Sequence, residues 1–157
     1  MATTIKRAIA RISTPELQPA KIDRILVVSD DGALRKILHR LFSSEGYEVD
    51  VVPNSFFGLV ALCQRPPCAV VLDVADPDSS DCDLCQWIAN LVPDLPLVIL
   101  AAASELAYKA RLLEMGGDDY LAIPFSPKDL LERVRALIKR RSEIRLQDLY
   151  GLEANYM

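Results

Sequence analysis

The stretch that most constrains the fold of this chain runs from Cys68 to Asp73 and reads CAVVLD. It shows no alternation of polar and apolar residues, and it lies between a Pro-Pro pair and an acidic loop at 76–80. Such a run predicts a central parallel strand that helices cover on both faces. Asp73 then ends the strand. In an open α/β sheet, ligands bind at this carboxyl edge, so we expect a functional site there.

Four more apolar segments alternate with helical patterns along the chain. The expected strands lie at 24–28, 47–52, 97–100 and 120–123, and the partly alternating strand at 47–52 is expected at the sheet edge. Five strands alternating with five helices predict a doubly wound five-stranded parallel α/β sheet. We expect three parts: an N-terminal extension at 1–21, one domain at 22–141, and a C-terminal tail or linker remnant at 142–157.

Composition narrows the class of protein. No apolar run is long enough to cross a bilayer, and no signal-peptide pattern is present, which favours a cytoplasmic protein without a membrane segment. Residues 22–125 carry a net charge of −9, whereas 126–145 carry +4. The basic helix lacks interleaved aromatic residues, so we expect no direct nucleic-acid binding. The four cysteines have a partly zinc-like spacing, but strand geometry separates them, which favours reduced thiols.

Two helices carry unusual apolar residues. The helix expected at 54–64 would turn Gly58 and Leu62 toward the sheet, yet its other side carries Phe56 and Phe57. Either a partner or the N-terminal extension, with isoleucines at positions 5, 9 and 12, is expected to cover this second face. The helix expected at 82–91 would turn Trp87 inward.

Three motifs resemble the receiver domain of two-component response regulators. They are ILVVSDD at 25–31, VVLD at 70–73 with a following Pro77, and GGDDYLAIPF at 116–125. The resemblance covers about residues 21–141. It implies the flavodoxin-like (βα)5 receiver fold and a place in phosphorelay signal transduction.

The resemblance also implies roles for individual residues. In that family, two acids after the first strand and the aspartate of the third strand hold Mg²⁺, and that aspartate accepts a phosphoryl group from a sensor histidine kinase. Asp73 matches this phosphoacceptor and Asp30 the second acid, with Asp31 as a further candidate ligand. Tyr120 matches the aromatic residue that switches rotamer. At most, such a domain catalyses its own Mg²⁺-assisted phosphorylation, so it is not expected to be an enzyme.

Three positions depart from the family pattern. Ser29 stands where the first acid is expected, Ala101 at the Ser/Thr position, and Ile123 at the Lys position. Losing the lysine removes an attraction of ~4 kcal/mol at ~4 Å and an effective dielectric near 20. The interpretation is a degenerate receiver that acts through protein contacts, with weakened Mg²⁺ binding. The alternatives are a working phosphoacceptor at Asp73 and, less well supported, a flavodoxin-like enzyme. Asp73 itself is either functional or a retained structural carboxylate.

A set of charges resembles the dimer interface of the OmpR/PhoB class, whose receivers pair through the fourth helix, fifth strand and fifth helix. The set comprises Lys109, Asp118, Asp119, Asp129, Arg133 and Arg140. It implies a homodimer. The alternative is a solvated face whose charges pair within one chain.

Overall fold

The computed structural model describes residues 22–74, 81–102 and 116–156, with side chains described for all of these except 81, 82 and 152–156. Five parallel strands form one sheet in the order β2-β1-β3-β4-β5. The strands are β1 (Arg24–Val28), β2 (Glu48–Val52), β3 (Ala69–Asp73), β4 (Leu97–Ala102) and β5 (Asp119–Ile123). The predicted parallel sheet is confirmed, and β2 lies at an edge as its partly polar pattern indicates.

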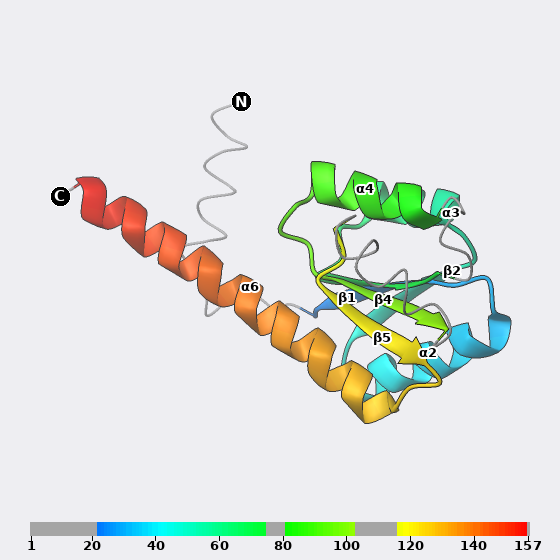
Figure 1. Cartoon of the computed structure of the whole chain (residues 1–157). Coiled ribbons are helices and arrows are strands. Elements are labelled where there is room, and N and C mark those ends of the chain that lie inside the picture. The colour runs from blue at the N-terminus through cyan, green and yellow to red at the C-terminus, as the bar shows by residue number, and fades with distance from the viewer. Residues whose placement is uncertain (1–21, 75–80, 103–115, 157) are drawn as a thin grey trace.

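The helices cover both faces of the sheet (Figure 1). On one face, α3 (Ser55–Gln64) and α4 (Asp81–Leu91) pack over a core that includes Leu26, Val70 and Ile99. On the other, α2 (Gly32–Ser44) and α6 (Pro127–Tyr156) enclose alternate residues of the same strands. Because successive side chains of a strand point to opposite faces, an unbroken apolar run supplies both cores. Residues 70–72 of β3 are fully buried, as the central strand requires.

Polar side chains begin two of the helices. Asn54 accepts a hydrogen bond from the backbone N–H of Phe57 and caps α3, as expected. Asp31 caps α2 by accepting hydrogen bonds from the N–H groups of Ala33 and Leu34. These caps satisfy backbone donors that have no partner inside the helix, and they place the start of both helices at the carboxyl edge of the sheet.

The last helix is longer than expected. The predicted domain ends at 141, and 142–157 are predicted to be a tail or linker remnant; α6 runs through this position to Tyr156 and extends past the body of the domain (Figure 1). Residues 142–150 read SEIRLQDLY and contain neither Gly nor Pro, so nothing in that stretch ends the helix. Gly151 sits in open space within the helix. The expected boundary at 141 therefore corresponds to no change of secondary structure.

The inward orientation of Trp87 was wrong. Leu84, Cys85 and Ile88 are the α4 side chains that face the core, and Trp87 is 47% exposed. Position 87 precedes the buried Ile88 by one residue, a rotation of about 100° around the helix. The buried face of α4 is therefore narrower than predicted, and Trp87 lies beside it.

Some expectations fall on residues outside the described ranges. They are the N-terminal extension at 1–21, the helix expected at 104–115 with Lys109, and the acidic loop at 76–80. Across the described ranges, no helix has both the length and the apolar character needed to span a membrane.

Candidate functional site

The candidate site lies at the carboxyl edge of β1 and β3. Pairing of Val28 with Leu72 brings the two strand ends side by side, although they lie 44 positions apart in the sequence. Ser29 is 1% exposed, and its hydroxyl donates a hydrogen bond of 2.8 Å to Oδ2 of Asp73. The same hydroxyl oxygen accepts a 3.1 Å bond from the N–H of Asp31. The structure thus joins the two predicted site positions, Ser29 and Asp73, through a direct hydrogen bond from a hydroxyl to a carboxylate.

The two acids after β1 are placed differently. Asp30 is exposed, next to the buried Ser29. The Oδ1 atom of Asp31 accepts bonds of 2.9 Å and 3.3 Å from the first turn of α2. A carboxylate oxygen that already holds two backbone N–H groups is a poor candidate for a metal ligand. Asp31 therefore caps α2 through Oδ1, and Asp30 is the exposed acid that directly follows Ser29.

The side chains described at this edge can be compared with the ligands that Mg²⁺ requires. Mg²⁺ requires several hard oxygen ligands in octahedral geometry and is usually held by carboxylates. Within the described part of the chain, no group of three or more His, Cys, Asp and Glu side chains is placed to hold a metal ion. Asp30 and Asp73 supply two carboxylates, and Ser29 supplies a hydroxyl whose hydrogen is directed at Asp73. The set is one negative charge short of the family pattern.

One cation near the site was not foreseen. The Nη1 atom of Arg35, in the first half of α2, donates a 2.7 Å hydrogen bond to the backbone carbonyl of Ser29. The bond holds the chain where it leaves β1 and brings a positive charge to the same loop. The sequence gives no signal for this contact, because Arg35 lies six positions after Ser29 and its side chain meets the Ser29 carbonyl only once the turn into α2 has formed.

The other two departures lie at the ends of β4 and β5. Ala101 is 2% exposed and pairs with Ala122 across the two strands. Ile123 is partly buried and packs against the core on the α2–α6 face. Both positions therefore present apolar side chains where the family pattern has a hydroxyl and an ammonium group.

Tyr120 points inward. It is 5% exposed, and its hydroxyl donates a 3.2 Å hydrogen bond to the backbone carbonyl of Ala102. This bond joins the predicted switch residue to the end of β4, one residue beyond Ala101.

The predicted interface charges divide into separate groups. Arg133 bonds within its own chain, through Nη1 to Asp119 at 2.9 Å and through Nε to Asp129 at 3.0 Å. Asp118 accepts a 2.7 Å bond from the N–H of Leu97, and burial raises the pKa of this carboxyl. Arg133, Asp119 and Asp129 thus form ion pairs within one chain, and Asp118 has a backbone partner.

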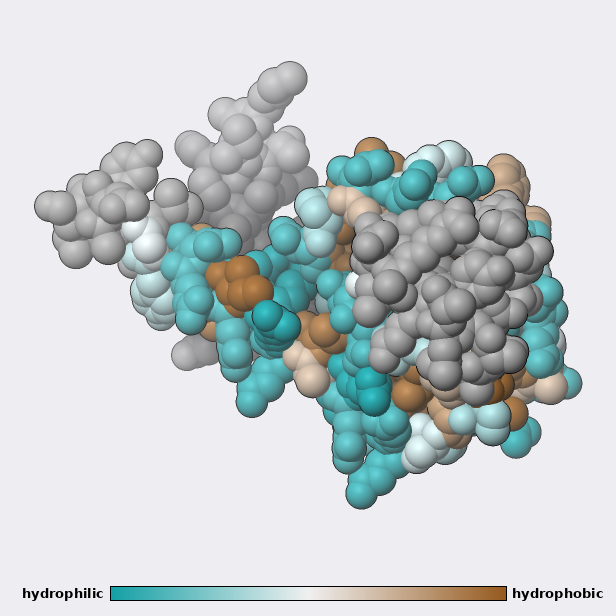
Figure 2. Space-filling model, in the orientation of Figure 1, coloured by the Kyte–Doolittle hydropathy of each residue, from teal (hydrophilic) through white to brown (hydrophobic). Residues whose placement is uncertain are grey.

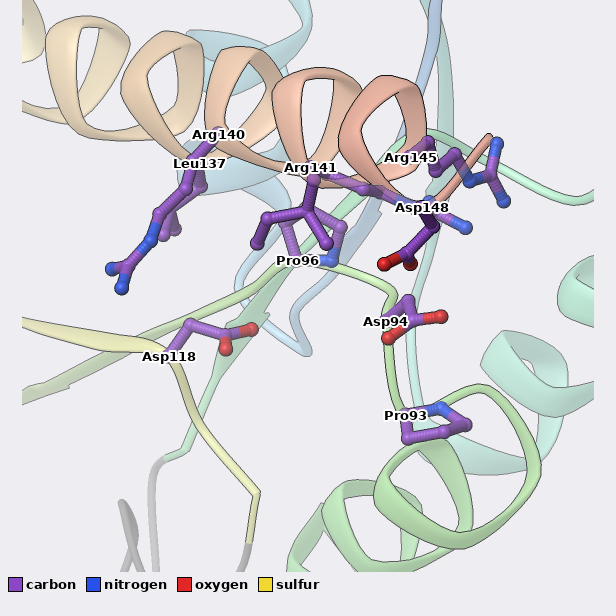
Figure 3. Close-up of a pocket in the computed structure, with 10 residues that line it drawn as sticks. Pro93, Asp94, Pro96, Asp118, Leu137, Arg140, Arg141, Arg145 and Asp148 are labelled. Atoms are coloured by element: carbon purple, nitrogen blue, oxygen red, sulfur yellow. The ribbon is translucent and has the colours of Figure 1, made fainter. Parts of the chain in front are cut away.

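Arg140 lines a pocket of about 300 Å³ at the opposite edge of the sheet (Figure 3). In Figure 3, side chains of α6, including Arg141 and Asp148, lie over the loop between α4 and β4, which contributes Asp94. Asp118 closes another side. Since Asp118 precedes β5 whereas Asp73 ends β3, this pocket is remote from the candidate site. Arg140 therefore belongs neither to the Asp73 edge nor to the ion pairs of Arg133.

Comparison with known families identifies the fold. A family described as "Response regulator receiver domain" matches residues 25–135. This chain belongs to that family. The match spans both the Asp73 edge and the Tyr120 strand, so the receiver resemblance of the three sequence motifs is confirmed. Receiver domains are signalling domains that generally use Mg²⁺ for phosphorylation, and their usual partners are sensor kinases.

Curated relatives of this receiver domain are transcription and response regulators. The chain is 36% identical over 133 residues to the transcriptional regulatory protein GltR of Pseudomonas aeruginosa, which covers 82% of this chain and 55% of GltR. It is 39% identical over 119 residues to the response regulator MprA of a Mycobacterium species, covering 76% of this chain and 52% of MprA. The chain thus spans about half the length of the relatives it matches.

Solved structures agree on the fold. A CheY-like receiver domain protein from Methanospirillum hungatei superposes with a TM-score of 0.72 at 25% identity, covering 78% of this chain and 98% of that one. A putative response regulator from Chloroflexus aurantiacus superposes with a TM-score of 0.70 at 30% identity, covering 76% and 99%. The α/β receiver fold expected from the sequence is therefore confirmed.

Proposed function

We propose that this receiver domain transmits a signal through protein–protein contacts, with little or no phosphorylation of Asp73. The observation that carries the proposal is the 2.8 Å hydrogen bond from Ser29 to Asp73. A hydroxyl occupies the position from which a second carboxylate would help to hold Mg²⁺. The hydrogen bond satisfies one oxygen of Asp73 without any metal, and so stabilises the unphosphorylated carboxylate.

The apolar substitutions support the same conclusion. Phosphoryl transfer depends mainly on positioning and on preorganised charge around the transferred group. With Ala101 and Ile123 at the two family positions, one hydrogen-bond donor and one cation are missing from the site. The link between a phosphoryl group and the conformation of Tyr120 is also lost, because Ala101 has no hydroxyl to move toward the phosphate. Arg35 remains the nearby cation, but its Nη1 already bonds a backbone carbonyl.

The second candidate function is a working phosphoacceptor that a histidine kinase phosphorylates on Asp73. Two observations favour it: the carboxylate of Asp73 ends β3 at the edge where the family places it, and the exposed Asp30 lies next to the residue that contacts it. In this alternative, Mg²⁺ binding is weakened but sufficient.

Phosphorylation in vitro separates the two functions. The purified chain is incubated with acetyl phosphate and Mg²⁺, and the intact mass is measured beside an Asp73→Asn variant. We expect no stoichiometric addition of phosphate to either protein. Stoichiometric phosphate that is absent from Asp73→Asn and requires Mg²⁺ would establish the second candidate and refute the first.

We further propose that the domain belongs to the OmpR/PhoB-like class and forms a homodimer through the surface of β5 and α6 that carries Arg133. A twofold axis would place the same patch on both subunits, so that Arg133 exchanges or adds a carboxylate partner across the axis. Arg133→Glu is expected to dissociate the dimer, whereas Lys36→Glu, the same charge change on α2, is not. Sedimentation at high micromolar concentration tests this, and a dimer that survives Arg133→Glu contradicts it.

A further inference from the structure

The outer side of α3 is apolar although it faces away from the sheet. Gly58 packs inward, where a Cβ atom would lie 3.1 Å from side chains of Val28 and Leu84. On the outside, Phe56 is 69% and Phe57 48% exposed. Their rings contact each other edge to face, with centroids 5.5 Å apart. Two neighbouring exposed aromatic rings on a helix of a single domain indicate a contact surface.

The neighbouring helix α4 also exposes apolar side chains. Leu84, Trp87 and Leu91 recur at i, i+3 and i+7, so they form one stripe. Leu84 meets α3 at Gly58, which places the stripe on the α3 side of α4. Beyond Leu84 the stripe is open, with Trp87 47% and Leu91 71% exposed.

The opposite side of α4 is already occupied, because a Cβ atom on Gly116 would lie only 2.6 Å from the Cβ atom of Ala89. Hydrophobic atoms are visible at the surface over α4 in Figure 2. We call Phe56, Phe57, Trp87 and Leu91 the α3–α4 apolar surface.

We infer that residues 1–20 of the same chain dock on the α3–α4 apolar surface. The segment carries Ile5, Ile9 and Ile12 at i, i+4 and i+7, which on a helix forms one apolar stripe. A stripe of three isoleucines over two turns matches a shallow surface of exposed aromatic and leucine side chains.

The segment is long enough to reach the surface from the point where it joins the domain. Ile22 lines the same hollow as Pro66 and Pro67, which follow the last turn of α3. As a helix, the stretch from Ile5 to Ile12 spans about 10 Å, and the ten residues of α3 span about 15 Å. Residues 13–21, if extended, bridge up to ~30 Å. The connection is therefore long enough to lay the isoleucine stripe along α3 and α4.

Charge favours the same occupant. Residues 1–21 carry four cations, among them Lys6 and Arg11, and the single anion Glu16. The sequences of α3 and α4 contain no Lys or Arg, whereas α4 contains Asp81 and Asp83. Asp83 is exposed and lies four positions before Trp87, on the same side of the helix. A basic amphipathic segment thus meets an apolar surface that has an acidic border, and it attaches at high local concentration because it is part of the same chain.

Trp87 provides a direct assay, because it is the only tryptophan of the chain. We compare the full-length chain with Ile9→Asp, which puts a charge in the isoleucine stripe, and with Ala10→Asp, which adds the same charge beside it. Acrylamide quenching and the emission maximum of Trp87 are measured, and thermal unfolding checks that all three proteins fold. In the wild type and in Ala10→Asp we expect blue-shifted emission and weak quenching.

Ile9→Asp is expected to shift the emission to the red and to raise the quenching constant roughly twofold or more, since a covered indole becomes half exposed. Equal quenching in all three proteins would overturn the inference. So would protection of Trp87 that disappears on dilution of the wild type, because that result assigns the surface to a second copy of the chain.

Discussion

Placing a carboxylate at position 29 tests the proposal that Ser29 weakens Mg²⁺ binding at the Asp73 edge. The substitution is Ser29→Asp, and Ser29→Asn is its control, with nearly the same shape and no charge. Both replacements remove the hydroxyl that donates to Asp73, and both keep an oxygen able to accept from the N–H of Asp31. A difference between the two variants therefore reports the added charge.

The magnitude follows from the 2.8 Å contact between Ser29 Oγ and Asp73 Oδ2. A carboxylate at position 29 places two negative charges ~4 Å apart, a repulsion of about 4 kcal/mol at an effective dielectric of 20 and about 1 kcal/mol at that of water. Because Ser29 is buried whereas Asp73 is partly exposed, we expect about 2 kcal/mol between these limits. For a domain of this size, that lowers Tm by roughly 4–8 °C relative to Ser29→Asn without divalent cations.

Mg²⁺ should reverse this loss. A cation that binds only the folded state stabilises it by about 2.7 kcal/mol at a free concentration of 100 times Kd. Thermal unfolding is measured with and without Mg²⁺ for the wild type and both variants. We expect the Tm of Ser29→Asp alone to rise strongly with Mg²⁺. An equal rise in the wild type would refute the reasoning, because it would show that the serine leaves the metal site intact.

Three further changes test the fold of the domain. Gly116→Ala is expected to lower the free energy of unfolding by about 2–5 kcal/mol, because a φ of 117° is strained for any side chain and the added Cβ atom would lie 2.6 Å from that of Ala89. Gly46→Ala is the control: its φ is 89° but its surroundings are open, so the expected loss is only about 1–2 kcal/mol. Denaturant unfolding compares the two variants. Asn54→Ala removes the cap of α3 and should lower stability by about 1 kcal/mol in the same assay. Burial raises the pKa of Asp118 above its ordinary value of 3.8, so the folded state binds this proton more tightly than the unfolded state. The free energy of unfolding therefore falls as the pH rises from the unfolded-state pKa to the higher folded-state pKa of Asp118. Asp118→Asn should flatten this pH dependence, and an unchanged pH profile would contradict the assignment.

Local patterns in the sequence were enough to predict much of the fold. The unbroken apolar runs predict buried parallel strands, since only a sheet covered on both faces has room for side chains pointing both ways. The position of Asp73 at the end of such a run predicts the functional edge. The cap at Asn54 and the edge position of β2 follow equally from short-range rules, because a cap or an alternating pattern involves only residues that are neighbours in the chain.

The tertiary structure alone decided which polar groups meet. Ser29 bonds Asp73 because the register of β1 and β3 aligns their ends, and Arg35 reaches the carbonyl of Ser29 only through the turn that Asp31 caps. Arg133 has carboxylates within reach on both β5 and α6, and only the packed distance selects its partners.

The side of α4 that carries Trp87 was likewise settled by packing. Apolar periodicity states that one face of a helix is buried, but a rotation of one residue decides whether an indole lies in the core or at its border. Residues 142–150 contain no Gly or Pro that would end the helix, so α6 continues past the body of the domain to Tyr156. The sequence therefore determined the elements and the edge where chemistry is placed, and the three-dimensional packing determined the contacts made there, because these depend on distances between residues far apart in the chain.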